Sequence, residues 1–200
     1  MTHLSDNKRD AILEAAARMF LAHGYAEASM DAIAEAAPVS KPTLYNYFDG
    51  KAALFEAVIR ARCDQLLAAL DAVDTTTGDF EAGLRAMARA CVDVIYEPGS
   101  LELFRVLVAG QLHHPDLGPI AYRSCAEPII DRIATYLRRS GTESGFVFGA
   151  VKESARVLLS LLMGDEHFRC LLGVQPAPSA RERVRFVNRV LPYYLKACRG

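Results

Sequence analysis

The chain has 200 residues, of which 52% are hydrophobic and 24% charged, and its net charge is −1 at pH 7. This length allows one large or two small domains, and the apolar content is enough to form a core. Alanine and leucine are abundant and runs of β-branched residues are few, which favours an all-α fold. No apolar run reaches the roughly 18 residues of a membrane span, and the polar start MTHLSDNKRD lacks the apolar segment of a signal peptide. We therefore expect a cytoplasmic protein without membrane contact.

The charge balance does not by itself indicate a nucleic-acid-binding protein, which usually carries a basic patch. Residues 1–55 contain five Lys and Arg against seven Asp and Glu. Any DNA contact in this region would therefore depend on where a few cations lie, chiefly Lys41 and Lys51. Residues 181–199 hold six Lys and Arg and one Glu. That basic end could touch nucleic acid, or it could be the solvated side of a terminal helix.

The five cysteines are scattered along the chain and form no C-x-x-C pair: Cys63, Cys91, Cys125, Cys170 and Cys198. An odd and scattered set argues against a disulfide framework or a zinc site. We expect reduced and mostly buried thiols. A redox-sensing role is the alternative.

The first predicted helix covers residues 6–23, where apolar residues recur at helical spacing and Gly24 follows as a C-terminal cap. Residues 30–51, MDAIAEAAPVSKPTLYNYFDGK, predict two short helices joined by a tight turn. A serine stands before each of these helices as an N-cap, Ser29 and Ser40. A short connection between two short helices is the outline of a helix-turn-helix.

Apolar residues of this helix pair are spaced to face each other: Ile33, Ala34, Ala37, Val39, Leu44 and Phe48. The polar and aromatic residues of the second helix are not needed for this contact and could bind a partner: Lys41, Thr43, Tyr45, Asn46 and Tyr47. Lysine donates to phosphate, and Thr, Tyr and Asn reach phosphates or base edges. The spacing also fits a helical hairpin in any all-α core, with its polar residues merely solvated.

Lys51 opens a long helix that ends near the loop-forming residues 75–78, and it is long enough to leave one domain and enter another. Further helices are predicted at residues 80–96, 101–112, 117–137, 146–172 and 181–198. Proline predicts a bend in two of them, at Pro128 and Pro192, and glycine in a third, at Gly164. The helix at 101–112 is apolar most of the way round, which predicts that it is buried.

Residues 9–59 resemble the DNA-binding domain of TetR/AcrR-type transcriptional regulators. The resemblance is carried by ILEAAARMFLAHGYAEASM, by Ile33-Ala34, by VSKPTLYNYF and by the Lys51 that follows. It implies a helix-turn-helix domain of three helices at 1–52, whose third helix enters the major groove of a palindromic operator in double-stranded DNA. It further implies a homodimer and a helical ligand-binding and dimerisation domain at 53–200, which senses a small-molecule effector.

Pro38 departs from the family pattern, which has glycine at this point of the turn. Proline fixes φ near −65° and does not readily adopt a left-handed conformation. We therefore expect the turn geometry to differ slightly, or Ala37 to bear the change.

Carried over by position, the family pattern assigns seven residues to the DNA face: Ser40, Lys41, Pro42, Thr43, Tyr45, Tyr47 and Lys51. Lys51 would meet a phosphate through its charge and at the N-terminus of its helix. Thr43 is the best candidate for a base-edge contact, because it is short and near the start of the recognition helix. Tyr45 and Tyr47 would bond to phosphate oxygens, and the alternative for Tyr45 is packing against the first helix.

The last two helices have broad apolar faces, and the resemblance places the dimer interface on them. The alternative is that both are buried within one chain. A ligand pocket would lie between helices and be mostly apolar with a few polar groups. Its candidate lining, each member of which could equally be ordinary core, is Cys91, Phe104, Val108, Gln111, Tyr122, Phe148, Lys152 and Arg156. Lys152 and Arg156 could meet an anionic group, or they could pair with acids such as Asp131 and Glu153.

We therefore expect a ligand-responsive transcriptional regulator, in its simplest form a repressor released from its operator by a small apolar or amphipathic molecule. We expect no cofactor and no enzymatic activity. Two polar groups, at residues 113–116 and 165–167, could be metal ligands or a catalytic set, but neither has a spacing such as H-E-x-x-H. A dimeric all-α interaction module without DNA affinity is the second alternative, because the N-terminal region is not basic.

Overall fold

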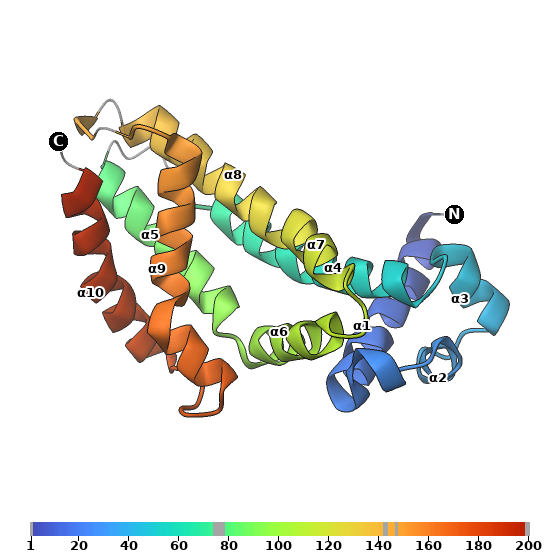
Figure 1. Cartoon of the computed structure of the whole chain (residues 1–200). Coiled ribbons are helices and arrows are strands. Elements are labelled where there is room, and N and C mark those ends of the chain that lie inside the picture. Colours follow the sequence, from blue (N-terminus) through green and yellow to red (C-terminus); the bar gives the residue numbers. More distant parts are fainter. Residues whose placement is uncertain (1, 74–78, 142–143, 147, 199–200) are drawn as a thin grey trace. The chain divides into compact units, whose positions relative to one another are not determined.

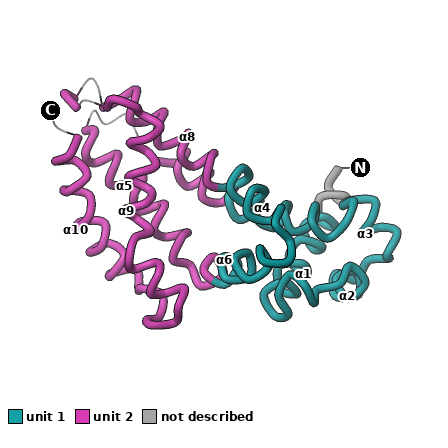
Figure 2. Tube along the Cα trace, in the orientation of Figure 1, with its two compact units in different colours: residues 1–63, 102–125 teal, residues 64–101, 126–200 magenta. Residues whose placement is uncertain are grey.

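The computed structural model describes residues 2–73, 79–141, 144–146 and 148–198 (Figure 1). Within these ranges every regular element is a helix, which confirms the all-α prediction. No helix in the described ranges is long and apolar enough to cross a membrane. The chain divides into two compact units, which Figure 2 shows in two colours.

Unit 1 comprises residues 1–63 and 102–125 (Figure 2). It contains α1 (Thr2–Glu27), α2 (Met30–Ala36), α3 (Lys41–Tyr47), α7 (Leu117–Ala121) and the π-helical turn η1 (Tyr122–Ala126). It also contains the first part of α4 (Lys51–Asp71) and most of α6 (Pro98–Gln111), helices that continue into the other unit. Three aromatic rings form the centre of its core, with Phe55 lying 5.0 Å from both Phe20 and Tyr25 between ring centroids. Gly24 adopts φ 76° inside α1, so the predicted cap position is an interruption of the helix.

Unit 2 comprises residues 64–101 and 126–200. Besides the remainder of α4 and the start of α6 it contains α5 (Phe80–Ile95), α8 (Glu127–Tyr136), the π-helical turn η2 (Leu137–Gly141), α9 (Val151–Leu171) and α10 (Ala180–Cys198). Helix α5 packs against both α9 and α10, and α8 packs against α9 (Figure 1). Gly83 of α5 leaves room for the Tyr136 side chain of α8, because a Cβ there would overlap the tyrosine hydroxyl, which donates to Phe80 O.

Two predicted bends are confirmed, and both have a local cause. Pro128 lies in the first turn of α8, and the π-helical η1 ends immediately before that helix. Proline has no N–H for the helical ladder, so the pattern of hydrogen bonds changes at that point. Gly164 adopts φ 45° inside α9 and kinks it. The hydroxyl of Tyr96 lies 3.1 and 2.9 Å from the carbonyl oxygens of the two residues before the kink and donates to them.

Some predicted boundaries and burials were wrong. Helix α6 begins at Pro98 rather than at Leu101, because proline suits the first helical position. Helix α9 begins at Val151 rather than at residue 146. The expectation that residues 101–112 are buried fails for Val108 and Leu112, which keep 58% and 82% of their surface exposed. An apolar composition cannot distinguish a core face from an exposed one.

The prediction that all cysteines are reduced thiols was wrong for two of them. Cys63 of α4 and Cys125 of η1 form a disulfide across a separation of 62 residues. Cys91, Cys170 and Cys198 are not disulfide-bonded. Spacing along the chain could not reveal the pair, because the two residues meet through tertiary packing.

The compact units do not begin and end where the predicted domains do. Residues 102–125 belong to the same unit as the N-terminal helices, and α4 continues from one unit into the other. The predicted boundary at residue 52 divides a DNA-binding domain from a ligand-binding and dimerisation domain, and this functional division stays a prediction.

Candidate nucleic-acid interface

Helices α2 and α3 form the predicted pair, and each has its predicted cap. The Ser29 hydroxyl accepts a hydrogen bond from Ala32 N at 3.1 Å, and the Ser40 hydroxyl accepts one from Thr43 N at 3.3 Å. Leu44 and Phe48 are buried in the unit 1 core, as predicted for the inner face of the second helix. The outer face of α3 is therefore held in place by packing beneath it and by a cap at its start.

The seven predicted DNA-face residues lie in one short segment, from the cap of α3 to the start of α4. Ser40, Lys41, Pro42 and Tyr45 are exposed, and Tyr45 keeps 45% of its surface accessible. Thr43, Tyr47 and Lys51 are half-buried. The structure thus leaves the start of α3 open to a partner, while its contacts with DNA stay a prediction.

Lys41 already has an intramolecular partner. Its ammonium lies 2.7 Å from a carboxylate oxygen of Asp31 on α2, and both side chains are exposed. The hydrogen bond and the charge of Asp31 raise the pKa of Lys41. Asp31 stands in the first turn of α2, where an acid also suits the helix dipole. Its proximity to Lys41, ten residues on, depends on how α2 and α3 cross.

Lys51 also makes internal contacts. Its ammonium donates to the carbonyl oxygen of Ala26 at 2.9 Å and lies 4.7 Å from the centroid of the Tyr25 ring. The bond satisfies a carbonyl in the last turn of α1, where such groups have no intrahelical partner. A lysine ammonium has three donors, so this contact leaves capacity for a phosphate. No pattern in the sequence indicated Ala26 as a partner.

In the turn between α2 and α3, the alternative that Ala37 bears the change imposed by Pro38 is wrong. Pro38 itself adopts φ 22°, while Ala37 has φ −93° and ψ 13°. Val39 N donates to Ala34 O at 3.1 Å, which is the longer hydrogen bond of a Schellman C-cap. The turn therefore keeps the longer hydrogen bond of such a cap, and the proline takes a positive φ that is smaller than the usual left-handed value of about 57°.

The eight predicted effector residues are divided between the units. Four lie in unit 1, namely Phe104, Val108, Gln111 and Tyr122, and four in unit 2, namely Cys91, Phe148, Lys152 and Arg156. The side-chain amide of Gln111 accepts from Gly118 N at 2.6 Å and donates to Pro115 O at 2.7 Å, which braces the turn between α6 and α7. Val108 and Tyr122 are exposed.

The unit 2 members of this set have clear structural contacts. Cys91 is fully buried, and Phe148 lies in an aromatic group with Phe80 and Phe146. Lys152 pairs with Asp131 at 2.6 Å and Arg156 with Glu153 at 3.1 Å, the acid partners considered as the alternative. An effector-binding role for any of the eight stays a prediction.

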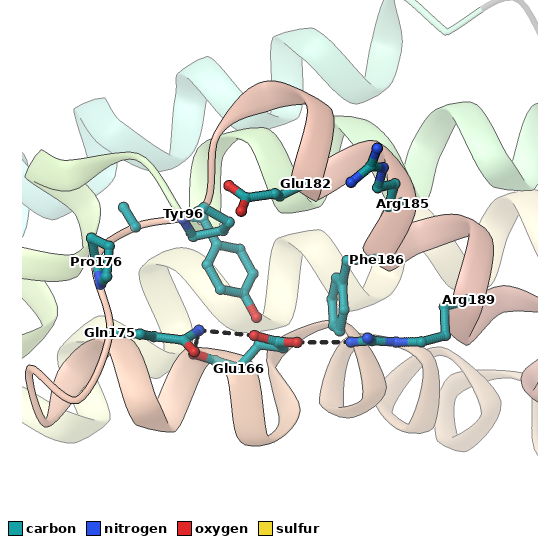
Figure 3. Close-up of a pocket in the computed structure, with 10 residues that line it drawn as sticks. Tyr96, Glu166, Gln175, Pro176, Glu182, Arg185, Phe186 and Arg189 are labelled. Atoms are coloured by element: carbon teal, nitrogen blue, oxygen red, sulfur yellow. Dashed lines mark hydrogen bonds and ion pairs between the residues drawn. The ribbon is translucent and has the colours of Figure 1, made fainter.

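Unit 2 contains a pocket of about 290 Å³ between α5, the α9–α10 connection and α10 (Figure 3). The Glu166 carboxylate accepts from Gln175 Nε2 at 2.8 Å and pairs with Arg189 at 2.7 Å. These two hydrogen bonds hold the pKa of Glu166 below its ordinary value. The described lining includes none of the eight predicted effector residues, and it carries four charged groups, Glu166, Glu182, Arg185 and Arg189.

The two polar groups considered for catalysis are explained by neighbouring contacts. His114 packs edge-on against Tyr25 at 4.6 Å, and the buried His167 does the same against Tyr96 at 5.7 Å. Burial lowers the pKa of His167. In the part of the chain that the structure describes, no three His, Cys, Asp or Glu residues lie close enough to hold a metal ion.

Comparisons with known proteins agree with this geometry. Residues 12–58 match the family model of bacterial regulatory proteins of the tetR family. Residues 82–198 match the model of the C-terminal domain of AefR-like transcriptional repressors. The HTH-type transcriptional activator FasR of Mycolicibacterium smegmatis is 33% identical over 142 residues, which cover 70% of this chain and 63% of that protein. The chain therefore spans less than two thirds of the length of this relative.

Solved structures resemble the chain over nearly its whole length. The flavonoid-responsive regulator FrrA is 32% identical, with a TM-score of 0.80 and coverage of 96% of this chain and 97% of that one. A TetR-family transcriptional regulator from Mesorhizobium loti MAFF303099 is 25% identical, with a TM-score of 0.84 and coverage of 98% of both chains.

Proposed function

The chain belongs to the TetR family of bacterial transcriptional regulators, and from that premise we propose that it is a ligand-responsive repressor. It would bind a palindromic operator through α3 and leave it when a small apolar or amphipathic molecule binds. The observation that carries this proposal is the start of α3, where Lys41, Pro42 and Tyr45 are exposed above a buried Leu44. A capped helix fixed from beneath suits insertion into a major groove.

The proposed DNA contacts divide by chemistry. Thr43 would reach a base edge, because its short side chain stands in the first turn of α3. Lys41, Lys51 and the two tyrosines of α3 would meet phosphates, which position the helix without reading sequence. Since residues 1–55 carry more acids than bases, binding would depend on these few contacts rather than on bulk attraction.

We also propose that the protein acts as a homodimer through α9 and α10. Large apolar side chains are exposed along these helices, among them Phe168 and Tyr193 with 59% and 72% of their surface accessible. An exposed apolar surface of this kind is typical of an interaction site. A two-fold contact between the same helices of two copies would bury it, and it would match a palindromic operator.

Two observations support repression and the ligand class. The C-terminal model that matches residues 82–198 describes AefR-like repressors. The solved relative FrrA is a flavonoid-responsive regulator, and a flavonoid is a small, flat, amphipathic molecule of the kind expected here. FasR, by contrast, is an activator, so the direction of control requires a direct measurement.

The decisive experiment is selection of bound DNA from a random pool, with the full chain. We expect enrichment of a palindrome, and Thr43→Val should relax preference at one base pair of each half-site because it removes a hydroxyl while keeping the shape. A pool without enrichment would favour the interaction module. Addition of a flavonoid such as naringenin should then weaken binding to the selected site, and unchanged binding across a panel of apolar ligands would contradict the release mechanism.

Oligomeric state tests the dimer independently. Sedimentation at micromolar concentration should give a dimer for the natural chain and a monomer for Phe168→Arg. Leu112→Arg is the matched control, because Leu112 is at least as exposed but lies in the turn directly after α6. A natural chain that sediments as a monomer would refute the two-fold model.

A further inference from the structure

The disulfide within unit 1 joins the long helix α4 to the π-helical turn η1. The Cα atoms of Cys63 and Cys125 are 5.3 Å apart, within the usual range for such bonds. Cys63 keeps 2% of its surface exposed, whereas Cys125 is half-buried. Small solutes can therefore approach the bond from the side of Cys125.

The compartment determines what such a bond can do, and here the inference rests on the proposed function. A bacterial transcriptional regulator works beside chromosomal DNA, where thiols are kept reduced. Disulfides in such a compartment are usually transient and either catalytic or redox-sensing. Cys91 provides the contrast, because complete burial raises the pKa of its thiol to about 12 and leaves it inert.

The bond is placed where it can affect the DNA-reading end. Cys63 lies on the same helix as Lys51, about 18 Å further along at 1.5 Å per residue. Cys125 packs against the hydrophobic core that α1, α2, α3 and α4 share. Next to it, the Ser124 hydroxyl donates to Glu56 of α4 at 3.2 Å. Oxidation fixes η1 to α4 covalently, and reduction leaves the two joined by this weak hydrogen bond and by packing.

The geometry of η1 makes it suited to respond. A π-helical turn is a rare arrangement that often occurs at functional sites. Here it is followed within two residues by Pro128, which cannot donate to a regular helical ladder. A segment with this irregular hydrogen bonding can rearrange when its covalent attachment is broken.

We propose that Cys63 and Cys125 form a reversible thiol–disulfide site, oxidised by a hydroperoxide and reduced by a dithiol, whose state changes the affinity of the protein for DNA. The Cys125 thiolate attacks the peroxide, the O–O bond breaks, and a sulfenic acid and an alcohol or water form. The Cys63 sulfur then attacks the sulfenic sulfur, and the disulfide forms with release of water. Two thiols thus supply the two electrons and two protons that reduce one peroxide. A dithiol reverses the change by becoming a disulfide itself.

The first measurement follows the bond in the full chain. The reduced protein is treated with an equimolar amount of hydrogen peroxide, and its tryptic peptides are weighed without reduction. We expect a linked Cys63–Cys125 peptide pair that disappears on addition of dithiothreitol. Failure of this pair to form, or its resistance to dithiothreitol in the folded protein, would overturn the proposal.

The second measurement compares DNA affinity of the two forms on the selected operator. We expect a difference of about tenfold in Kd, within the ordinary range of allosteric coupling. Cys125→Ser and Cys63→Ala should each abolish this difference, and Cys198→Ser, which leaves the pair intact, should retain it. Two variants are used because Cys63 is buried and its replacement alone could disturb folding.

Equal affinity of the fully oxidised and fully reduced protein would refute the link to DNA binding. Binding in neither form, and in none of the variants, would instead refute the proposed DNA-binding function. In that case the peptide measurement would still decide whether the pair cycles.

Discussion

Replacement of Pro38 by glycine should stabilise the protein, because this proline occupies a position made for glycine. Helix α2 ends at Ala36, Ala37 is its cap, and Pro38 follows with φ 22°. Val39 N closes the turn onto Ala34 O at 3.1 Å. The residue before the donor in such a cap is usually a glycine in the left-handed region. The pyrrolidine ring, by contrast, favours φ near −65°.

The magnitude follows from three contributions. A non-glycine residue at positive φ costs about 1–3 kcal/mol, and a ring-constrained residue belongs at the upper end. Proline also cannot donate the second hydrogen bond of this cap, which contributes about 0.5–1.5 kcal/mol where it forms. Against these gains, glycine loses about 0.4–1 kcal/mol more in backbone entropy on folding. We therefore expect Pro38→Gly to stabilise by about 3 kcal/mol, or roughly 6–12 °C in Tm for a chain of this size.

Urea denaturation is the assay, with the midpoint compared at constant slope. Pro38→Ala should give a smaller gain, because it restores the donor but leaves a Cβ at positive φ. Pro42→Ala is the control, since Pro42 stands in the first turn of α3, where its φ is favourable, and its loss should be neutral or slightly destabilising. A Pro38→Gly variant that is no more stable than the natural chain would refute the reasoning about this turn.

Three further predictions concern charge. Asp31→Asn should tighten binding to all DNA sequences by a few-fold, because it removes an acid beside Lys41. The control Asp131→Asn in unit 2 should leave DNA affinity unchanged. Equal changes in Kd for the two variants in a binding titration would contradict this. Lys51→Met should weaken binding to all sequences alike and make the log–log salt slope shallower by about 0.9, and an unchanged slope would count against a phosphate contact. Burial lowers the pKa of His167 from its ordinary 6.5. As the pH falls, the imidazole is therefore protonated in the unfolded chain before it is protonated in the folded one. The free energy of unfolding should therefore decline below about pH 6.5. The urea midpoint of His167→Gln should decline less over the same range. An identical pH dependence of the two midpoints would exclude His167 as the cause.

Features written in short stretches of sequence could be predicted. Ser29 and Ser40 each cap the helix that begins at the next residue by accepting from the N–H three residues ahead. The apolar spacing around Leu44 determines which side of α3 faces inward. Pro128 and Gly164 interrupt helices for reasons contained in the residues themselves. These signals need no knowledge of how distant segments pack, which is why the reading helix and its exposed face could be anticipated.

Features that depend on packing angles could not be predicted. The partner of Lys41 lies ten residues away, and that of Lys51 lies 25 residues away. The disulfide partner of Cys63 lies 62 residues away. Each contact exists because two helices cross at a particular angle. The conformation of Pro38 could not be predicted either, because the packing of buried residues on both sides of the turn overrides the local backbone preference of proline.

The internal partners of the two lysines affect how tightly the proposed DNA reader would bind. An exposed ion pair such as that of Lys41 contributes little to stability, so a phosphate can replace Asp31 at small cost. That cost recurs at every DNA site, specific or not. Specific and non-specific binding therefore lose the same factor in affinity, and the ratio between them is left to the base contacts. A weakly charged reading end with paired lysines would thus lower the overall affinity for DNA, while discrimination would depend on the few proposed base contacts of α3.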